Sequence, residues 1–372
     1  MNQRLLSLDA FRGLTIAAML LVNNPGDWGQ VYAPLLHAHW HGWTVTDWIF
    51  PFFVFISGVS MAMSLARRAQ GGANKTQLLT QTGRRALLII GIGVLLNGFP
   101  FYDLASLRLP GVLQRLGLCT LCAAPIVIWC GPRGLWLCAL GLLAAYAALQ
   151  LGVPVPDAEG VVRQASLQPG QDVGAWLDRA LFGPNHLWSQ ARTWDPEGLL
   201  STVPAVASQL LGVLAGRELH SRFAPADRAM RWTLAGLGSL VLAYVLDGAL
   251  MPINKSLWTP AFVCLTTGWA LIVFAAFYWL LDARPEPLAR ERWARALHPL
   301  VVFGMNALFL YIVAAVLAKL LELVPLGQAA YAAFLAWGFA PKSASLLHAI
   351  AFVAVMYAVA WFMYRRRWFV KV

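Results

Sequence analysis

Ten apolar stretches, each long enough to cross a membrane as a helix, recur along the 372-residue chain. A hydrocarbon core of about 30 Å requires a helix of about 20 apolar residues. Only 12% of the residues are charged, against about a quarter in soluble globular domains, which excludes an ordinary cytosolic enzyme. The sequence therefore predicts one all-α polytopic membrane domain over residues 1–372, with about ten transmembrane helices at 8–24, 47–66, 84–101, 111–130, 135–152, 198–217, 231–249, 257–281, 299–321 and 345–364.

The basic residues predict the orientation of these helices. Of the 28 Lys and Arg residues, 20 fall at the chain ends, in alternate loops such as 67–83 and 282–298, or at the adjoining helix ends. Because cytoplasmic loops carry the excess of positive charge, we expect both termini in the cytoplasm. The same distribution explains the net charge of +11 without nucleic acid as a partner, since nucleic acid would need a basic patch on a soluble surface. The long loop 153–197 then faces outward, as a connector or a lid.

Three of the seven histidines lie within five residues at the predicted outer mouth: His37, His39 and His41. Imidazole titrates near physiological pH, which suits a general base or an acyl-accepting nucleophile. Asp47 opens the next helix, where it either caps that helix or orients a histidine, as carboxylates do in catalytic triads. Alternate histidines can also bind zinc. We favour no metal, because no Cys or further His is close in sequence to complete a site.

Ionisable or amide side chains within apolar stretches indicate function by default. Asp9 and Arg12 are three residues apart, so on a helix they share a face and can pair. Arg115 lies one turn inside a predicted span and requires an anion. That anion is either a phosphate-bearing cofactor or a carboxylate from another helix. Asn306 lies inside the ninth span and could bond a neighbouring helix.

Further polar residues gather at the predicted outer helix ends. Glu197, Asn254 and Lys255 supply a carboxylate, an amide and an ammonium group. Trp40 and Trp258 lie nearby in sequence and supply flat apolar faces, or belong to the aromatic belt at the membrane interface. This mixture of groups is typical of sugar-binding sites.

Six segments, in the same order along the chain, resemble the heparan-alpha-glucosaminide N-acetyltransferase family of transmembrane acyltransferases. They are Ser7–Gly13 (SLDAFRG), His37–Gly58, Gly111–Gly117, Asp195–Gly198 (DPEG), Asn254–Trp258 (NKSLW) and Gly304–Asn306 (GMN). Lysosomal members of that family carry an additional luminal domain and span before this core. The chain is therefore similar to a shorter bacterial amino-sugar acetyltransferase branch, and we expect it in the bacterial inner membrane.

The resemblance implies an enzyme that moves an acetyl group from cytoplasmic acetyl-CoA to the amine of a terminal glucosamine on the outer side. The family's active-site histidine falls on His37 and its asparagine on Asn23, with Asn24 as an alternative. The implied catalytic residues are His37, Asn23 and Asp47. The implied donor-binding residues are Arg12, Gln114, Arg115 and Asn306, and the implied acceptor-binding residues are Asn24, Trp40, Glu197, Asn254, Lys255 and Trp258.

Two other functions fit the sequence. Ten spans with buried polar groups also suit a transporter of amino sugars or oligosaccharides. A membrane O-acyltransferase acting on lipids or surface glycans is the second alternative. The expected partners are acetyl-CoA, an amino-sugar or glycan acceptor and membrane lipids, and the oligomeric state, a homodimer included, stays open.

Overall fold

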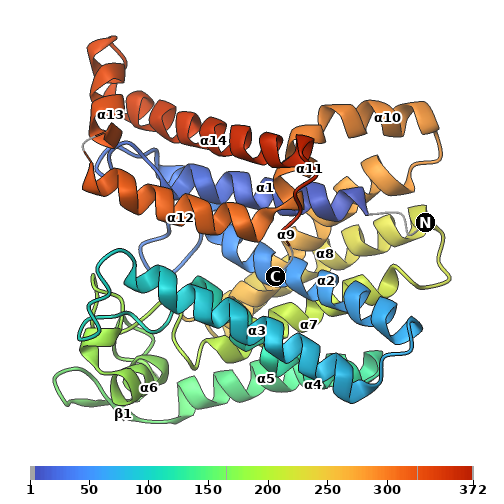
Figure 1. Ribbon diagram of the computed structural model, residues 1–372. Coiled ribbons are helices and arrows are strands. Elements are labelled where there is room, and N and C mark those ends of the chain that lie inside the picture. Colours follow the sequence, from blue (N-terminus) through green and yellow to red (C-terminus); the bar gives the residue numbers. More distant parts are fainter. Residues whose placement is uncertain (1–4, 165, 325, 371–372) are drawn as a thin grey trace.

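The computed structural model describes residues 5–164, 166–324 and 326–370, and in these the chain is almost entirely helical (Figure 1). The α-helices are α1 (Leu6–Asn23), α2 (Ile49–Gln70), α3 (Lys75–Gly98), α4 (Val112–Trp129), α5 (Pro132–Gly152), α6 (Val173–Phe182), α7 (Thr202–Glu218), α8 (Pro225–Ala249), α9 (Pro260–Tyr278), α10 (Pro287–Ala296), α11 (His298–Met305), α12 (Ala307–Leu323), α13 (Leu326–Ala336) and α14 (Pro341–Arg365). Short helical turns are η1 (Ala33–Leu35), η2 (Val45–Trp48), η3 (Pro184–His186) and η4 (Trp279–Ala283).

Every predicted span coincides with a helix, but two of them differ from the expectation. Within the described residues, eight helices are long and apolar enough to cross a membrane, and α11 with α12 would make a ninth. The ninth predicted span is broken, because α11 and α12 meet at an angle of 80° around Asn306. The sixth begins at Thr202 rather than 198, since residues 198–201 form a turn that leaves α7 with 17 residues.

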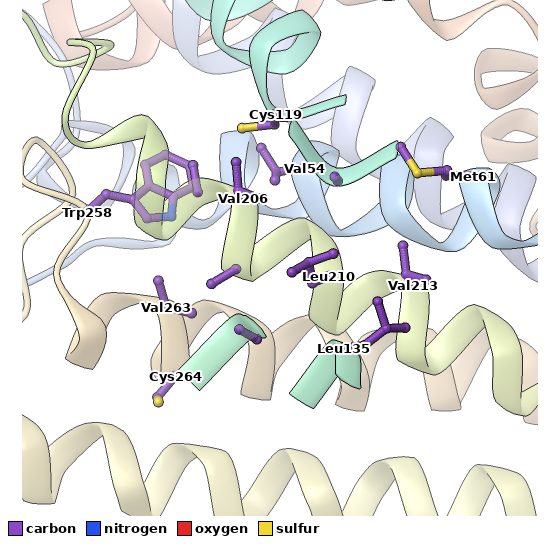
Figure 2. Close-up of a cluster of buried hydrophobic side chains, with 14 of the residues drawn as sticks. Val54, Met61, Cys119, Leu135, Val206, Leu210, Val213, Trp258, Val263 and Cys264 are labelled. Carbon is purple, nitrogen blue, oxygen red and sulfur yellow. The ribbon is translucent and has the colours of Figure 1, made fainter. Parts of the chain in front are cut away.

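The short helix α7 lies at the centre of the bundle. Figure 2 shows its Val206, Leu210 and Val213 between α2 and α4 on one side and α5 and α9 on the other. A helix that is buried on all sides needs apolar residues all round, and α7 has them.

Glycines let pairs of helices approach closely. A Cβ atom at Gly58 of α2 would collide with the backbone of α7, and one at Gly212 of α7 would collide with the backbone of α2. Gly13 of α1 and Gly304 of α11 are related in the same way. Small residues at such contacts are typical of membrane helix packing. These contacts explain the glycines in three of the segments that carry the family resemblance.

The connections gather at two opposite ends of the bundle. In Figure 1, α10 and the start of α1 lie at one end, and α6, β1 and α13 lie at the other. The connection 153–197 contains a two-stranded antiparallel sheet, β1 (Val155–Pro156) with β2 (Val162–Arg163), followed by α6. This arrangement follows the predicted alternation of loops, and the segment expected to be an irregular loop has secondary structure of its own.

Candidate active site

His37 and Asp47 form a hydrogen-bonded pair at the end of the bundle where α2 begins. Nδ1 of His37 is 2.7 Å from Oδ1 of Asp47. Oδ2 of the same carboxylate accepts hydrogen bonds from the backbone N–H groups of Ala38 and Thr44. The sequence left open whether Asp47 caps the helix or orients a histidine, and it does both. The His37 side chain is 50% exposed while that of Asp47 is 1% exposed, so a buried carboxylate holds an imidazole that is partly open to solvent.

Lys255 lies against the same imidazole. Its Nζ is 3.1 Å from Nδ1 and 3.2 Å from Nε2 of His37, and 3.8 Å from Oδ1 of Asp47. Two contacts between distant loops fix this position. Asn254 donates from Nδ2 to the carbonyl of Trp40, and the N–H of Gly42 donates to the carbonyl of Ile253. Asn254 is fully buried, so it positions the loops rather than facing a ligand.

Glu197 lies behind Lys255 in a second charged group. Arg108 donates to both carboxylate oxygens of Asp195 at 2.9 and 2.6 Å and to Oε2 of Glu197 at 2.6 Å. Burial raises the pKa of Glu197, but the charges of Arg108, Arg115 and Lys255 outweigh it and lower the pKa overall. Sequence reasoning missed Arg108. The available signal was a positive residue on the predicted outer side, where membrane orientation gives no reason for one.

Arg115 is fully buried one turn into α4. Its Nη2 donates to the carbonyl of Gly198 and to the hydroxyl of Ser201, which fixes the turn before α7. Its guanidinium lies 5.2 Å from the centroid of the Trp258 ring. Nε and Nη1 of Arg115 have no hydrogen-bond partner in the described part of the chain. The sequence predicted either a cofactor phosphate or a carboxylate as the partner of Arg115, and in the described residues its partners are instead a carbonyl, a hydroxyl and an aromatic ring.

Two further predicted binding residues have packing contacts. Trp258 is fully buried, and its Nε1 donates to the hydroxyl of Ser208. Gln114 is buried on α4 and donates to the carbonyl of Leu109. Neither the Trp258 ring nor the Gln114 amide is open to a sugar or a cofactor in this arrangement.

Trp40 connects the histidine segment to the 153–197 segment. Its Nε1 donates to the carbonyl of Leu167, and its ring centroid is 4.9 Å from that of Trp194. A small cavity, with room for about one water molecule, lies beside these rings and is also lined by Ser256 and Asp178. Burial raises the pKa of Asp178 to about 7. The segment therefore packs closely on the histidine loop as a structured cover.

The two asparagines at the end of α1 differ in their contacts. Asn24 donates from its side chain to the carbonyl of Leu20, which closes the last turn of α1. Asn23 is exposed, and among the described residues its side chain makes no hydrogen bond. The structure thus leaves Asn23, the first choice from the family pattern, open to a ligand.

Arg12 and Asn306 have different sets of partners. Arg12 donates to Asp9 at 3.0 Å, as its spacing predicted, and to the hydroxyl of Ser60 at 2.8 Å. The amide of Asn306 bonds the backbone of the segment after α14, donating to the carbonyl of Trp368 and accepting from the N–H of Val370. Each of the four residues expected to bind the donor has hydrogen-bond partners within the chain.

We call His37, Asp47, Lys255, Glu197 and Arg108 the His37 cluster, and Asp9, Arg12, Ser60 and Gly304 the Arg12 cluster. His39 is exposed, and burial lowers the pKa of His41, which lies 3.4 Å from Asn254. Over the residues described, no group of three or more His, Cys, Asp and Glu side chains is arranged to hold a metal ion.

Comparison with known proteins agrees with the sequence motifs. Residues 4–168 match the family model described as heparan-alpha-glucosaminide N-acetyltransferase, catalytic. The proteins named heparan-alpha-glucosaminide N-acetyltransferase from Homo sapiens and Mus musculus are 30% and 32% identical to the chain over 358 and 362 residues. The chain is thus similar to members of this family over most of its length. These alignments cover 83% of the chain and 52% and 53% of the two relatives, so the chain spans about half the length of the curated relatives it matches.

The match to the family model includes only part of the His37 cluster. His37, Asp47 and Arg108 lie within residues 4–168, whereas Lys255 and Glu197 lie beyond them. The catalytic segment of the family thus meets residues from the second half of the chain at His37.

Proposed function

We propose that the protein is a transmembrane N-acetyltransferase. It would move an acetyl group from cytoplasmic acetyl-CoA to the amine of glucosamine, or of a glucosamine-terminated sugar, on the outer side. The observation that carries this proposal is the imidazole of His37, which is oriented by buried Asp47 and partly open to solvent. Similarity to the acetyltransferase family supports the choice of reaction.

His37 acts as a general base in this proposal. With Nδ1–H donating to Asp47, Nε2 is the ring nitrogen that carries the lone pair, and the acceptor nitrogen would have to approach it beside the Nζ atom of Lys255. The acceptor nitrogen attacks the thioester carbonyl carbon, and Nε2 takes the proton that this nitrogen loses as the C–N bond forms. The C–S bond then breaks, and the proton passes from Nε2 to the departing sulfur. The products are the acetamide and free CoA thiol, so atoms and charge balance.

Asn23 is the proposed hydrogen-bond donor to the developing oxyanion. Its side chain is exposed at the end of α1, and a neutral amide donor suits that role. Asn24 is committed to closing α1 and is the weaker choice.

Release of CoA thiol by the purified protein tests the proposed activity. We expect thiol release from acetyl-CoA only when glucosamine is added, and N-acetylglucosamine as the product. A transporter would release no thiol. An O-acyltransferase would prefer an acceptor without the free amine, and either result would reject the proposal.

We also propose that the protein lies in the bacterial inner membrane with both termini in the cytoplasm, as the arginine distribution predicts. Single cysteines at the exposed positions Gln70 and Gln190, in a variant without the native cysteines, test the orientation in intact cells. An impermeant thiol reagent should label position 190 and leave position 70 unlabelled. The reverse pattern would overturn the orientation.

A further inference from the structure

Asp47 presents a difficulty for a base at position 37. A carboxylate 2.7 Å from Nδ1 stabilises the doubly protonated imidazolium. A histidine that already carries both protons cannot accept another. A positive charge close to the ring would counter this effect and favour the neutral form.

The structure provides that charge from a different part of the chain. The Nζ atom of Lys255 is nearly equidistant from the two ring nitrogens of His37, at 3.1 and 3.2 Å. An ammonium group in this position repels a protonated imidazole, since like charges within about 4–6 Å disfavour the charged form. The Lys255 side chain is only 20% exposed, so solvent screens the interaction incompletely.

Lys255 is itself placed among carboxylates. The pKa of Lys255 is lowered overall, first by burial and also by the charge of Arg115, while the nearby carboxylates of Asp47 and Glu197 act in the opposite direction and limit this decrease. Arg108 holds Glu197 in place. Of the described residues, Asp47 from the turn before α2 and Lys255 from the connection before α9 are the charged groups in hydrogen-bond or ion-pair contact with the His37 ring. The other histidines of its own loop, His39 and His41, make no recorded contact with it.

We propose that Lys255 is a positioning residue that offsets Asp47 and keeps the His37 imidazole unprotonated, ready to act as a base. Asp47 sets the orientation and the tautomer of the ring, and Lys255 sets its protonation state. This inference rests on the proposed function for its catalytic meaning. The coupling between the two side chains can nevertheless be measured without any acetyl transfer.

The direct test is the titration of His37 in the purified full-length protein. The neutral ring reacts with diethyl pyrocarbonate, so the rate of modification at residue 37, followed by peptide mass spectrometry from pH 5 to pH 9, gives its pKa. In Lys255→Met we expect this pKa to rise by about one unit, which leaves about tenfold less neutral imidazole at pH values below the wild-type midpoint. Lys255→Arg should stay close to wild type, because it keeps the charge.

Two controls make the result specific. Lys342→Met removes an exposed lysine from the start of α14 and should leave the His37 titration unchanged. Lys255→Gln is the second neutral variant, used if the methionine variant does not give a monodisperse protein. An unchanged His37 pKa in a folded neutral variant would overturn the proposal.

Kinetics separate this inference from the proposed function. If both hold, the acid limb of the pH profile of kcat/KM for thiol release should move upward with the His37 pKa in Lys255→Met, and activity should recover at high pH. A uniform loss at every pH, with no change in titration, would assign Lys255 a different role and reject the proposal. A shifted titration without thiol release in any variant would retain the Lys255–His37 coupling and reject the acetyltransferase function.

Discussion

The His37 cluster and the Arg12 cluster contain similar side chains but differ in how these are used. In the His37 cluster the charged groups come from connections, and one of them, His37, is half exposed. In the Arg12 cluster they come from helices, where Arg12 joins α1 to α2 and α11 through Asp9, Ser60 and the carbonyl of Gly304. Polar residues inside a membrane domain can thus form a reactive site or join helices. Exposure of one well-oriented member distinguishes the two.

The first prediction has the largest expected effect and tests whether the His37 cluster is the reactive site. His37→Ala should lower the rate of acetyl transfer by at least about 10²–10⁴-fold, the usual contribution of a general base, while the protein still inserts and purifies. His39→Ala is the matched control, because His39 is exposed on the same loop, and it should retain activity. If His39→Ala lost turnover and His37→Ala kept it, the assignment of the site would be wrong.

The second prediction concerns pH and the cover over the site. Asp178 of α6 has a pKa raised from 3.8 to about 7 by burial. The folded state therefore keeps a proton that the unfolded state has lost. The free energy of unfolding should fall as pH rises from about 4 to about 7, by up to ~4 kcal/mol.

Thermal unfolding at pH 5 and pH 8 measures this effect. Asp178→Asn should be close to wild type at pH 5 and more stable than wild type at pH 8. The Arg12→Met variant should keep the full pH dependence of wild type, since the Arg12 cluster lies apart from α6. A wild-type protein whose stability does not change over this range would contradict the prediction.

Arg115 gives the third test, because the sequence assigned it to the donor and the structure places it against the turn before α7. Arg115→Met removes the hydrogen bonds to Gly198 and Ser201 and should lower the free energy of unfolding by about 3 kcal/mol, as for buried charged hydrogen bonds. Denaturant titration measures this loss, and calorimetry measures acetyl-CoA affinity. A lower affinity for acetyl-CoA with an unchanged free energy of unfolding would assign Arg115 to the donor site.

The smallest effect is expected at Arg12. Arg12→Met should cost about 1–2 kcal/mol, in the range of interhelical hydrogen bonds in membranes, and leave the turnover of acetyl-CoA nearly unchanged. Denaturant titration and the thiol assay on the same preparation measure both. Loss of turnover with an unchanged free energy of unfolding would contradict the distinction between the two clusters, because Arg12 would then take part in the reaction.

The sequence predicted the helical fold well because hydropathy reports directly on membrane spans. It did not predict the break at Asn306, where the apolar pattern continues without interruption while the backbone turns by 80°. It also placed the start of α3 at 84 rather than Lys75. The first turns of that helix are polar and are fixed by hydrogen bonds between Asn74 and Gln77.

For the site, the sequence identified the residue types but not their partners. The pairing of His37 with Asp47 followed from local sequence, since the two are ten residues apart. The contact with Lys255 joins residues that are 218 positions apart in the chain, and a local sequence motif cannot predict a contact at that separation. Asn254, Trp258 and Gln114 carry the family pattern, yet they have positioning or packing contacts, because a motif does not reveal which of its members face outward.

One carboxylate, that of Asp47, both completes the cap of η2, the turn that leads into α2, and holds His37. The start of this helical segment and the orientation of the base therefore depend on the same side chain. A substitution at position 47 would be exposed to selection twice, once through the yield of folded protein and once through its chemistry. Position 47 should therefore tolerate fewer substitutions than a residue with only one of these two roles. A compensating substitution elsewhere would have to restore both the helix cap and the orientation of His37.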